Sequence, residues 1–245
     1  MAGKHQFFLC IASLLLSSFC YGQPKDSSAI YKKASLTSEY EISPRLAHRK
    51  AQKILKDNFF WSTVDPSSPF GNDEGAEVFH GFRQWRATNK KTSPLTYLDQ
   101  LIRSWDFPKF DVYELDTTRI KEYITSKNTT SAEVYNNTVL LEQFRHMVKT
   151  SGSDFSEDQF KELLTNSSES RGEYFLTAID NAIIAVGFAQ LVLEGTIEED
   201  IRTITQIAIR RELLPLLIEK WGTDYQSIRM QQLNQMLTVL EKLKK

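Results

Sequence analysis

Ala182-Ile-Ile-Ala-Val-Gly-Phe-Ala-Gln-Leu-Val-Leu193 is the stretch that decides the fold, because only Gly187 and Gln190 interrupt its apolar side chains. A helix that is apolar on every side belongs at the centre of a fold rather than on its surface. These twelve residues are too few to cross a bilayer, which takes about 20. We therefore expect a buried core helix near 180–194, closed by Gly195, with the other helices packed around it.

Helix signals recur on both sides of this stretch. Ser43-Pro44 and Ser93-Pro94 each pair an N-cap residue with a first-turn proline, and Asn72-Asp73 and Asp116 also read as helix starts. Further helices are expected near 132–149, 156–165 and 196–222, the last one split at Pro215, and an amphipathic helix ends the chain. Residues 108–115 partly alternate and indicate at most one short strand or extended segment. The sequence predicts an all-α fold with a single multi-helix domain over 43–245.

The charge balance argues against nucleic acid as a partner. The chain has 245 residues, with 30 Lys+Arg against 31 Asp+Glu and a formal net charge of -1. A nucleic-acid-binding domain normally carries a basic patch or an excess of positive charge. Hydrophobic residues make up 41% of the chain, which is enough for a continuous core.

The N-terminus has the pattern of a signal peptide over residues 1–22. Lys4 precedes an apolar run from Phe7 to Phe19, and Cys20-Tyr21-Gly22 offers small residues at a cleavage site. Cleavage there would remove Cys10 and Cys20 and leave a cysteine-free mature chain without stable membrane insertion. Residues 23–42 are polar and read as a leader or linker. We expect an exported protein, periplasmic or secreted, and the alternative is that residues 1–22 remain as an uncleaved membrane anchor.

The most informative polar segment is the loop Asp65-Pro-Ser-Ser-Pro-Phe-Gly-Asn-Asp-Glu-Gly75 and the helix that follows it. Its prolines and glycines fix the shape of the loop, and its acids gather at a helix start. The order of its residues does not fit a calcium-binding loop. The candidate binding residues are the following: Phe70, Gly71, Asn72, Asp73, Glu74, Gly75, Arg83, Trp85, Arg86 and Asp180.

A metal site is the alternative use of the same helix. Asp73, Glu77 and His80 would share one helix face, and Glu-x-x-His is a spacing that helical di-iron sites use. A di-iron site needs further carboxylates and a second such pair, which the sequence does not supply. Helix capping by Asp73 and Glu74 is the structural interpretation. We therefore expect no cofactor, with a divalent metal ion as the alternative.

Five charged residues have structural interpretations of their own. Arg83, Trp85 and Arg86 form a basic-aromatic patch with neighbouring phenylalanines, and this patch could stack on a ligand. The structural interpretation is that the aromatic residues are buried and that both arginines are solvated. Asp180 precedes the apolar stretch and reads as its N-cap, or else as a buried partner of a basic group. Arg210 and Arg211 read as a solvated helix face with weak ion pairs.

Two blocks of the chain resemble the YfeS-like family of uncharacterised bacterial proteins. The first runs from Ser68-Pro-Phe-Gly-Asn-Asp-Glu-Gly-Ala76 through Gly81-Phe-Arg-Gln-Trp-Arg86 to Ser93-Pro-Leu-Thr-Tyr-Leu98, and the second is Asp180 to Gly195. The likeness spans about 44–220. It implies a bacterial origin and a helical domain, and it brings no catalytic residues with it. The exported N-terminus is unlike the cytoplasmic members of that family.

Two functional hypotheses follow from the sequence. The first is a non-catalytic protein-interaction module whose protein partner binds at the loop of residues 65–77. The second is a metal-dependent or acid-base enzyme that uses Asp73, Glu77 and His80. The sequence fixes neither the oligomeric state nor the identity of a partner.

Overall fold

The computed structural model describes residues 41–126, 138–151, 156–160 and 171–243. The predicted signal peptide and nearly all of the predicted leader lie outside these ranges. The described elements are all helical: η1 (Pro44–Leu46), α2 (Arg49–Ile54), η2 (Asn58–Trp61), α3 (Asp73–Thr88), α4 (Pro94–Ser104), α5 (Thr117–Thr125), α7 (Thr138–Ser151), α9 (Arg171–Glu194), α10 (Glu199–Glu212), α11 (Pro215–Ile218) and α12 (Thr223–Lys242). The predicted all-α fold is confirmed.

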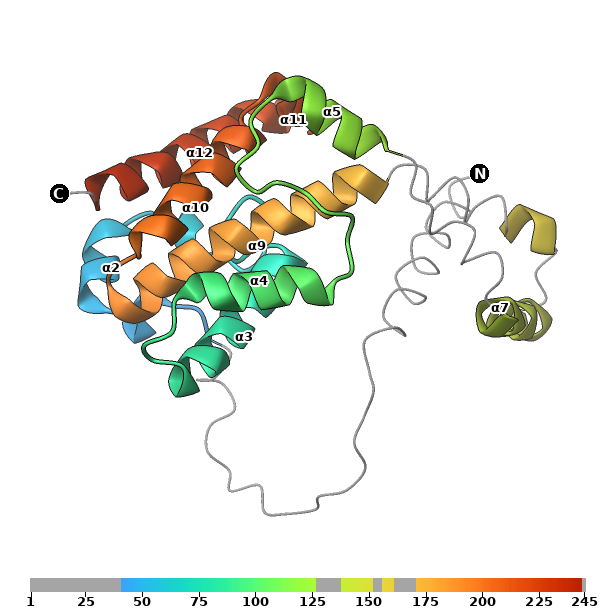
Figure 1. Cartoon of the computed structure of the whole chain (residues 1–245), viewed down its shortest axis with the longest axis horizontal. Helices are drawn as coiled ribbons and strands as arrows, with labels where there is room; N and C mark the ends of the chain where they lie inside the picture. The colour runs from blue at the N-terminus through green and yellow to red at the C-terminus, as the bar shows by residue number, and fades with distance from the viewer. Residues whose placement is uncertain (1–40, 127–137, 152–155, 161–170, 244–245) are drawn as a thin grey trace, which may run out of the picture. The chain divides into compact units, whose positions relative to one another are not determined.

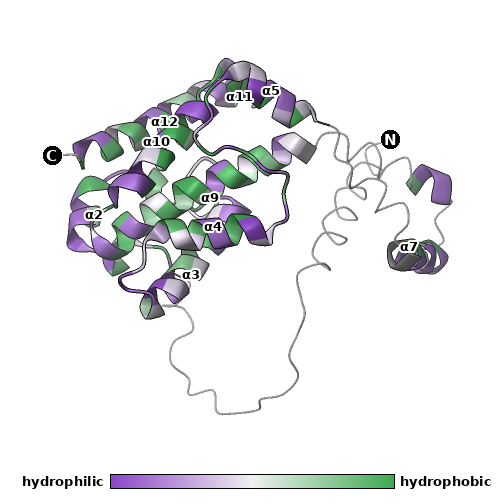
Figure 2. Ribbon diagram, viewed as in Figure 1, coloured by the Kyte–Doolittle hydropathy of each residue, from purple (hydrophilic) through white to green (hydrophobic). Residues whose placement is uncertain are grey.

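Helix α9 is the core helix that the sequence predicts. Every residue from Ala178 to Val192 is buried, and α3, α4, α5 and α10 all pack against this helix (Figure 1). Residues 172–194 are apolar and long enough to span a membrane by length and composition alone, and 89% of their most apolar window is buried inside the protein. Figure 2 shows the same contrast, with hydrophobic residues along α9 and mixed faces on the helices around it.

Glycine allows both the end of α9 and its closest helix contact. Gly195 has a φ of +71°, and its N–H donates to the carbonyl of Leu191 at 2.8 Å, as expected of a residue that terminates a helix. A Cβ on Gly187 would lie 3.0 Å from Cγ2 of Thr205, so the absence of a side chain lets α10 approach α9 closely.

The predicted helix starts are confirmed at three of four places. Asn72 caps α3, Ser93 caps α4 and Asp116 caps α5, each by accepting a hydrogen bond from a first-turn N–H. Ser43-Pro44 instead opens only the short 3₁₀ turn η1, and the α-helix itself begins at Arg49. The predicted break at Pro215 is also confirmed, because α10 ends at Glu212 and α11 begins at this proline.

The segment between α4 and α5 is the extended connection that the sequence allowed. Residues 107–116 form no strand and reach α5 by way of a turn at Asp111, whose carbonyl accepts a hydrogen bond from the N–H of Glu114 at 3.0 Å. Figure 1 shows this segment running beside α9. Phe107 packs on Phe175 of α9, with the ring centroids 4.4 Å apart, so an aromatic contact fixes the connection to the core helix.

Helix α7 carries a contact of its own with residues 157–160. The rings of Phe144 and Phe160 stack with their centroids 4.0 Å apart, and Arg145 pairs with Glu157 at 2.9 Å. The predicted helix at 156–165 is confirmed as far as residue 160, and the rest of that prediction lies outside the described residues.

Candidate functional site

The structure places the candidate loop at residues 62–72, because η2 ends at Trp61 and the predicted residues from Asp73 onward belong to α3. This loop contains two buried serines. Ser67 and Ser68 are each only 1% exposed. The Ser68 hydroxyl donates to the carbonyl of Ser62 at 2.7 Å, and the N–H of Ser67 donates to Oδ1 of Asp65 at 3.0 Å. The Ser67 hydroxyl is paired with the hydroxyl of Tyr225, 2.9 Å away, so the buried polar groups of both serines are satisfied and the loop has one defined conformation.

Helix α12 holds this loop in place. The Tyr225 hydroxyl donates to Oδ1 of Asp65 at 2.8 Å, and Nε2 of Gln232 donates to Oδ2 of the same carboxylate at 2.8 Å. Nη1 of Arg229 donates to the carbonyl of Ser67 at 3.2 Å. Three side chains on one helix therefore anchor a loop that lies about 160 residues earlier in the sequence.

Three of the predicted loop residues, Phe70, Gly71 and Gly75, have structural roles. Phe70 is fully buried and packs edge-on against Phe79 with the ring centroids 4.8 Å apart, so it belongs to the core. A Cβ on Gly71 would overlap the backbone of Asp65, and one on Gly75 would lie 3.2 Å from the Cα of Phe70. These glycines permit close backbone approach, and neither offers a side chain to a ligand.

The predicted metal residues do not converge. Asp73 and Glu77 are exposed on α3, and His80 is half-buried further along the same helix. Burial, and secondarily the charge of Arg83, lowers the pKa of His80. Among the described residues, no group of three or more His, Cys, Asp or Glu side chains is placed to hold a metal ion. The cap of α3 is Asn72, with Asp73 and Glu74 in the first turn.

The predicted basic-aromatic patch is split in two. The guanidinium of Arg83 lies over the Phe79 ring, 4.6 Å from its centroid. Trp85 is half-buried and packs against Tyr97, with the ring centroids 5.5 Å apart. Arg86 is only 9% exposed, so the expectation of a solvated arginine is wrong at this position.

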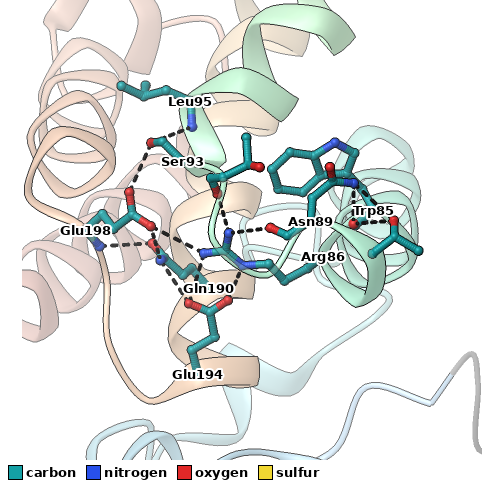
Figure 3. A network of polar contacts seen from close by, with 10 residues as sticks. Trp85, Arg86, Asn89, Ser93, Leu95, Gln190, Glu194 and Glu198 are labelled. Carbon is teal, nitrogen blue, oxygen red and sulfur yellow. Dashed lines mark hydrogen bonds and ion pairs between the residues drawn. The ribbon is translucent and has the colours of Figure 1, made fainter.

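Arg86 is the centre of a polar network that joins three helices (Figure 3). Its guanidinium pairs with both oxygens of Glu194 and donates to Oε1 of Glu198 at 3.3 Å. Gln190 donates to Glu194 at 3.0 Å and accepts the N–H of Glu198 at 3.0 Å. Ser93 completes the network by donating to Glu198 at 3.0 Å. Carboxylate pairing raises the pKa of Arg86 and keeps it charged, so this arginine links α3, α9 and the start of α10.

The same guanidinium also fixes the turn between α3 and α4. Arg86 donates to the carbonyl of Asn89 at 3.2 Å and to the carbonyl of Thr92. Figure 3 shows Asn89 beside Arg86 at this turn, while the Ser93 hydroxyl is directed at Glu198. Most donors of the guanidinium are thus used inside the protein, which indicates a structural role for Arg86.

Asp180 and Arg211 form a second buried ion pair, and their positions show that two of the predictions are wrong. Asp180 lies within α9, where it is not an N-cap, and its carboxylate accepts from Nη2 of Arg211 at 2.5 Å and from Nε at 3.0 Å. Both side chains have zero exposure, so the prediction of a solvated Arg211 is wrong. The alternative interpretation of Asp180, a buried partner of a basic group, is confirmed. Without Arg211, the ionised carboxylate of Asp180 would lie in the core with no compensating charge.

Arg211 also fastens the extended connection before α5. Its Nη1 donates to the carbonyl of Val112 at 3.1 Å and to that of Glu114 at 2.7 Å. The guanidinium lies over the Phe110 ring, 4.9 Å from its centroid. One side chain of α10 therefore satisfies polar groups from α9 and from a segment without regular hydrogen bonding.

The buried charges continue from this pair toward the candidate loop. The residue after Arg211 is Glu212, and it accepts from Nη2 of Arg229 at 3.0 Å with both side chains nearly fully buried. Arg229 lies over Trp221, 5.0 Å from the ring centroid, and bonds the carbonyl of Ser67 at 3.2 Å. The loop is therefore connected to the core by charge-assisted hydrogen bonds, which are stronger than neutral ones.

Stability is expected to fall as the pH rises from about 4 to about 7 because of Asp180. Burial raises the pKa of this carboxyl from 3.8 to about 7, and the charge of Arg211 offsets only part of the effect. In this range the folded state binds more protons than the unfolded state, so the free energy of unfolding decreases with pH. Urea denaturation at several pH values measures the slope. The Asp180→Asn variant should lack this component, and equal slopes in the two proteins would contradict the prediction.

The sequence analysis missed the residues of α12 that hold the loop. Arg229 is the only charged residue from Tyr225 to Leu240, and it is 2% exposed. A single charge in a long uncharged helical segment is a signal that it is paired inside the protein. Asp65, Tyr225 and Gln232 give no comparable signal, because their contacts depend on tertiary structure.

Comparisons of this chain with protein-family models, with curated proteins and with solved structures found no match.

Proposed function

We propose that the chain is an exported bacterial protein that acts as a non-catalytic protein-interaction module. The partner would bind the loop of residues 62–72 and the first turns of α3. One observation carries the proposal: this loop is anchored to α12 through buried serines, yet Val64 within it is 86% exposed. Binding residues are often carried by loops that a rigid scaffold holds in place, and Val64 is the apolar side chain that this loop presents to solvent.

The anchoring of the loop supports this function energetically. A mobile loop loses conformational entropy when it binds, and that loss weakens the complex. Here the hydrogen bonds of Asp65 to Tyr225 and Gln232 already fix the loop before any partner arrives. The accessible residues Pro66, Asp73 and Glu77 add polar and acidic edges from the loop and from α3. We expect the partner surface to contain an apolar pocket with basic groups at its rim.

The proposed location outside the cytoplasm rests on the sequence. Residues 1–22 have the charge, apolar run and small residues of a signal peptide, and cleavage would leave no cysteine. The likeness of residues 44–220 to the YfeS-like family supports a bacterial origin. The module would then act in the periplasm or after secretion, where its stability depends on packing and buried ion pairs without disulfides.

Val64→Asp is expected to weaken partner binding by more than about tenfold, because it places a charge on the proposed apolar contact. The test is cross-linked capture from the envelope fraction of the source organism, followed by titration of the captured protein. Leu46→Asp is the matched control, because Leu46 is also an exposed apolar residue, at 42%, and lies outside the loop. Both variants should melt at the wild-type temperature.

Equal partner binding by the two variants would contradict the proposed surface.

The alternative function is a metal-dependent or acid-base enzyme that uses Asp73, Glu77 and His80. Its support is the lowered pKa of His80, which keeps the imidazole neutral and able to ligate near pH 7. Near-stoichiometric metal in protein purified without chelator, lost in Glu77→Ala, would favour that enzyme over the interaction module.

A further inference from the structure

Helix α12 has an exposed face without a single charge. Between Asp224 and Glu241 the only charged residue is Arg229, and it is buried against the loop of residues 62–72. The exposed side chains on this part of the helix are Ser227, Ile228, Met230, Gln231, Asn234 and Thr238. One residue in four of the whole chain is charged, so an uncharged surface of this length is a distinctive feature of the helix.

These residues form one continuous stripe. Ser227, Gln231, Asn234 and Thr238 follow one another at spacings of four, three and four, which places them on the same side of an α-helix. Met230 and Ile228 flank the stripe and are 40% and 45% exposed. From Ser227 to Thr238 the stripe is about 16 Å long. Depletion of charge with exposed Met and Ile is the composition found at the centre of protein interfaces.

We propose that this stripe is a contact surface between two copies of the chain, with α12 packed against α12 of the second copy. In a two-fold contact each surface meets its own equivalent, so any net charge on it would repel itself. This surface has none. Its serine, threonine, glutamine and asparagine side chains each carry both a donor and an acceptor, so the same residues can bond to one another across the two-fold axis.

The stripe is separate from the loop proposed to bind a protein partner. Arg229, Tyr225 and Gln232 are the residues of α12 that face the loop, and none of them belongs to the stripe. The side-chain amide of Asn234 donates to the carbonyl of Met230 at 2.8 Å, and the Thr238 hydroxyl donates to the carbonyl of Asn234 at 2.9 Å, so both bonds stay within the helix. One helix face is smaller than the roughly 800 Å² per subunit of a standard interface, so the dimer should be weak, with a dissociation constant on the order of micromolar.

Two complementary double variants test the dimer. One is Gln231→Glu with Asn234→Glu, and the other is Gln231→Lys with Asn234→Lys. The two positions lie on either side of the middle of the stripe, so like charges meet whether the helices pair parallel or antiparallel. Gln84→Glu with Gln100→Glu is the matched control, because both glutamines are exposed on other helices. Sedimentation of the protein purified from its host gives the oligomeric state, and circular dichroism checks the fold.

The wild type and the control should form dimers with the same dissociation constant. Each double variant alone should be at least tenfold weaker, and mixing the two variants should restore dimers because opposite charges then face each other. A wild type that stays monomeric well above micromolar concentration would overturn the proposal. So would double variants that dimerise like the control, or a mixture of folded variants that stays monomeric. None of these outcomes affects the loop, whose test is capture of a different protein.

Discussion

Replacing Arg211 with methionine is expected to lower the free energy of unfolding by about 3–5 kcal/mol at a pH of about 8. The substitution leaves Asp180 without its partner at a position with zero exposure. It also removes the donor to the carbonyls of Val112 and Glu114. A buried charge without a partner costs far more than a lost surface ion pair. Urea denaturation measures the change.

The neighbouring residue provides a close control for this variant. Arg210 is exposed on the same helix, so Arg210→Met should change the free energy of unfolding by no more than about 0.5 kcal/mol. Adding Asp180→Asn to Arg211→Met should recover part of the lost stability, because the uncompensated charge is then gone. Lowering the pH to about 5 should have a similar effect, since Asp180 then binds a proton. Equal stability of Arg210→Met and Arg211→Met would show that the pair is not a structural element of the core.

Phe188→Ala is expected to cost about 3–5 kcal/mol of stability. Phe188 is fully buried on α9 and stacks on Phe60 with the ring centroids 5.7 Å apart. Removing its ring loses apolar burial and leaves a cavity between α9 and the segment that contains η2, where packed neighbours relax only partially. Chemical denaturation of the variant gives the loss directly.

Tyr174→Ala is the control for the role of α9. Tyr174 lies on the same helix and is 55% exposed, so its removal should cost less than about 1 kcal/mol despite its contact with Phe107. If Phe188→Ala and Tyr174→Ala had similar effects, α9 would not be the packing centre of the domain.

The arrangement around α9 could be predicted because its cause is local in the sequence. A long apolar stretch that is interrupted only by Gly187 and Gln190 and closed by Gly195 allows few alternatives. The starts of α3, α4 and α5 carry side-chain caps within three residues of the hydrogen bonds they make. Ser43 is followed by a proline, as Ser93 is, but it makes no capping hydrogen bond, and only a 3₁₀ turn follows it. The local signal therefore predicts a helix start but does not guarantee one.

The ion pairs could not be predicted, because their partners are far apart in the chain. Arg86 and Glu194 are separated by 108 residues, and Asp180 and Arg211 by 31. A sequence shows that an arginine lies on a helix, but it does not show which other helix covers that arginine. On average an arginine is exposed, so the solvated interpretation of Arg86 and Arg211 followed the usual behaviour and failed at both positions.

These ion pairs remove two residues from the set of candidate binding residues. Arg86 and Asp180 were candidate binding residues, but each is held by partners within the fold. The candidates that remain accessible belong to the loop and to the first turns of α3. In our account, buried charges hold the fold and fix the loop, and the exposed residues of the loop meet the partner.

The measurement that tests this account most directly compares partner capture with stability in Val64→Asp and Arg211→Met. We expect Val64→Asp to lose the partner and to keep the wild-type denaturation curve, because Val64 is 86% exposed. We expect Arg211→Met to lose stability but still to capture the partner under conditions where it remains folded. Normal capture by Val64→Asp, together with lost capture by folded Arg211→Met, would contradict the account and place the functional site at the buried pair.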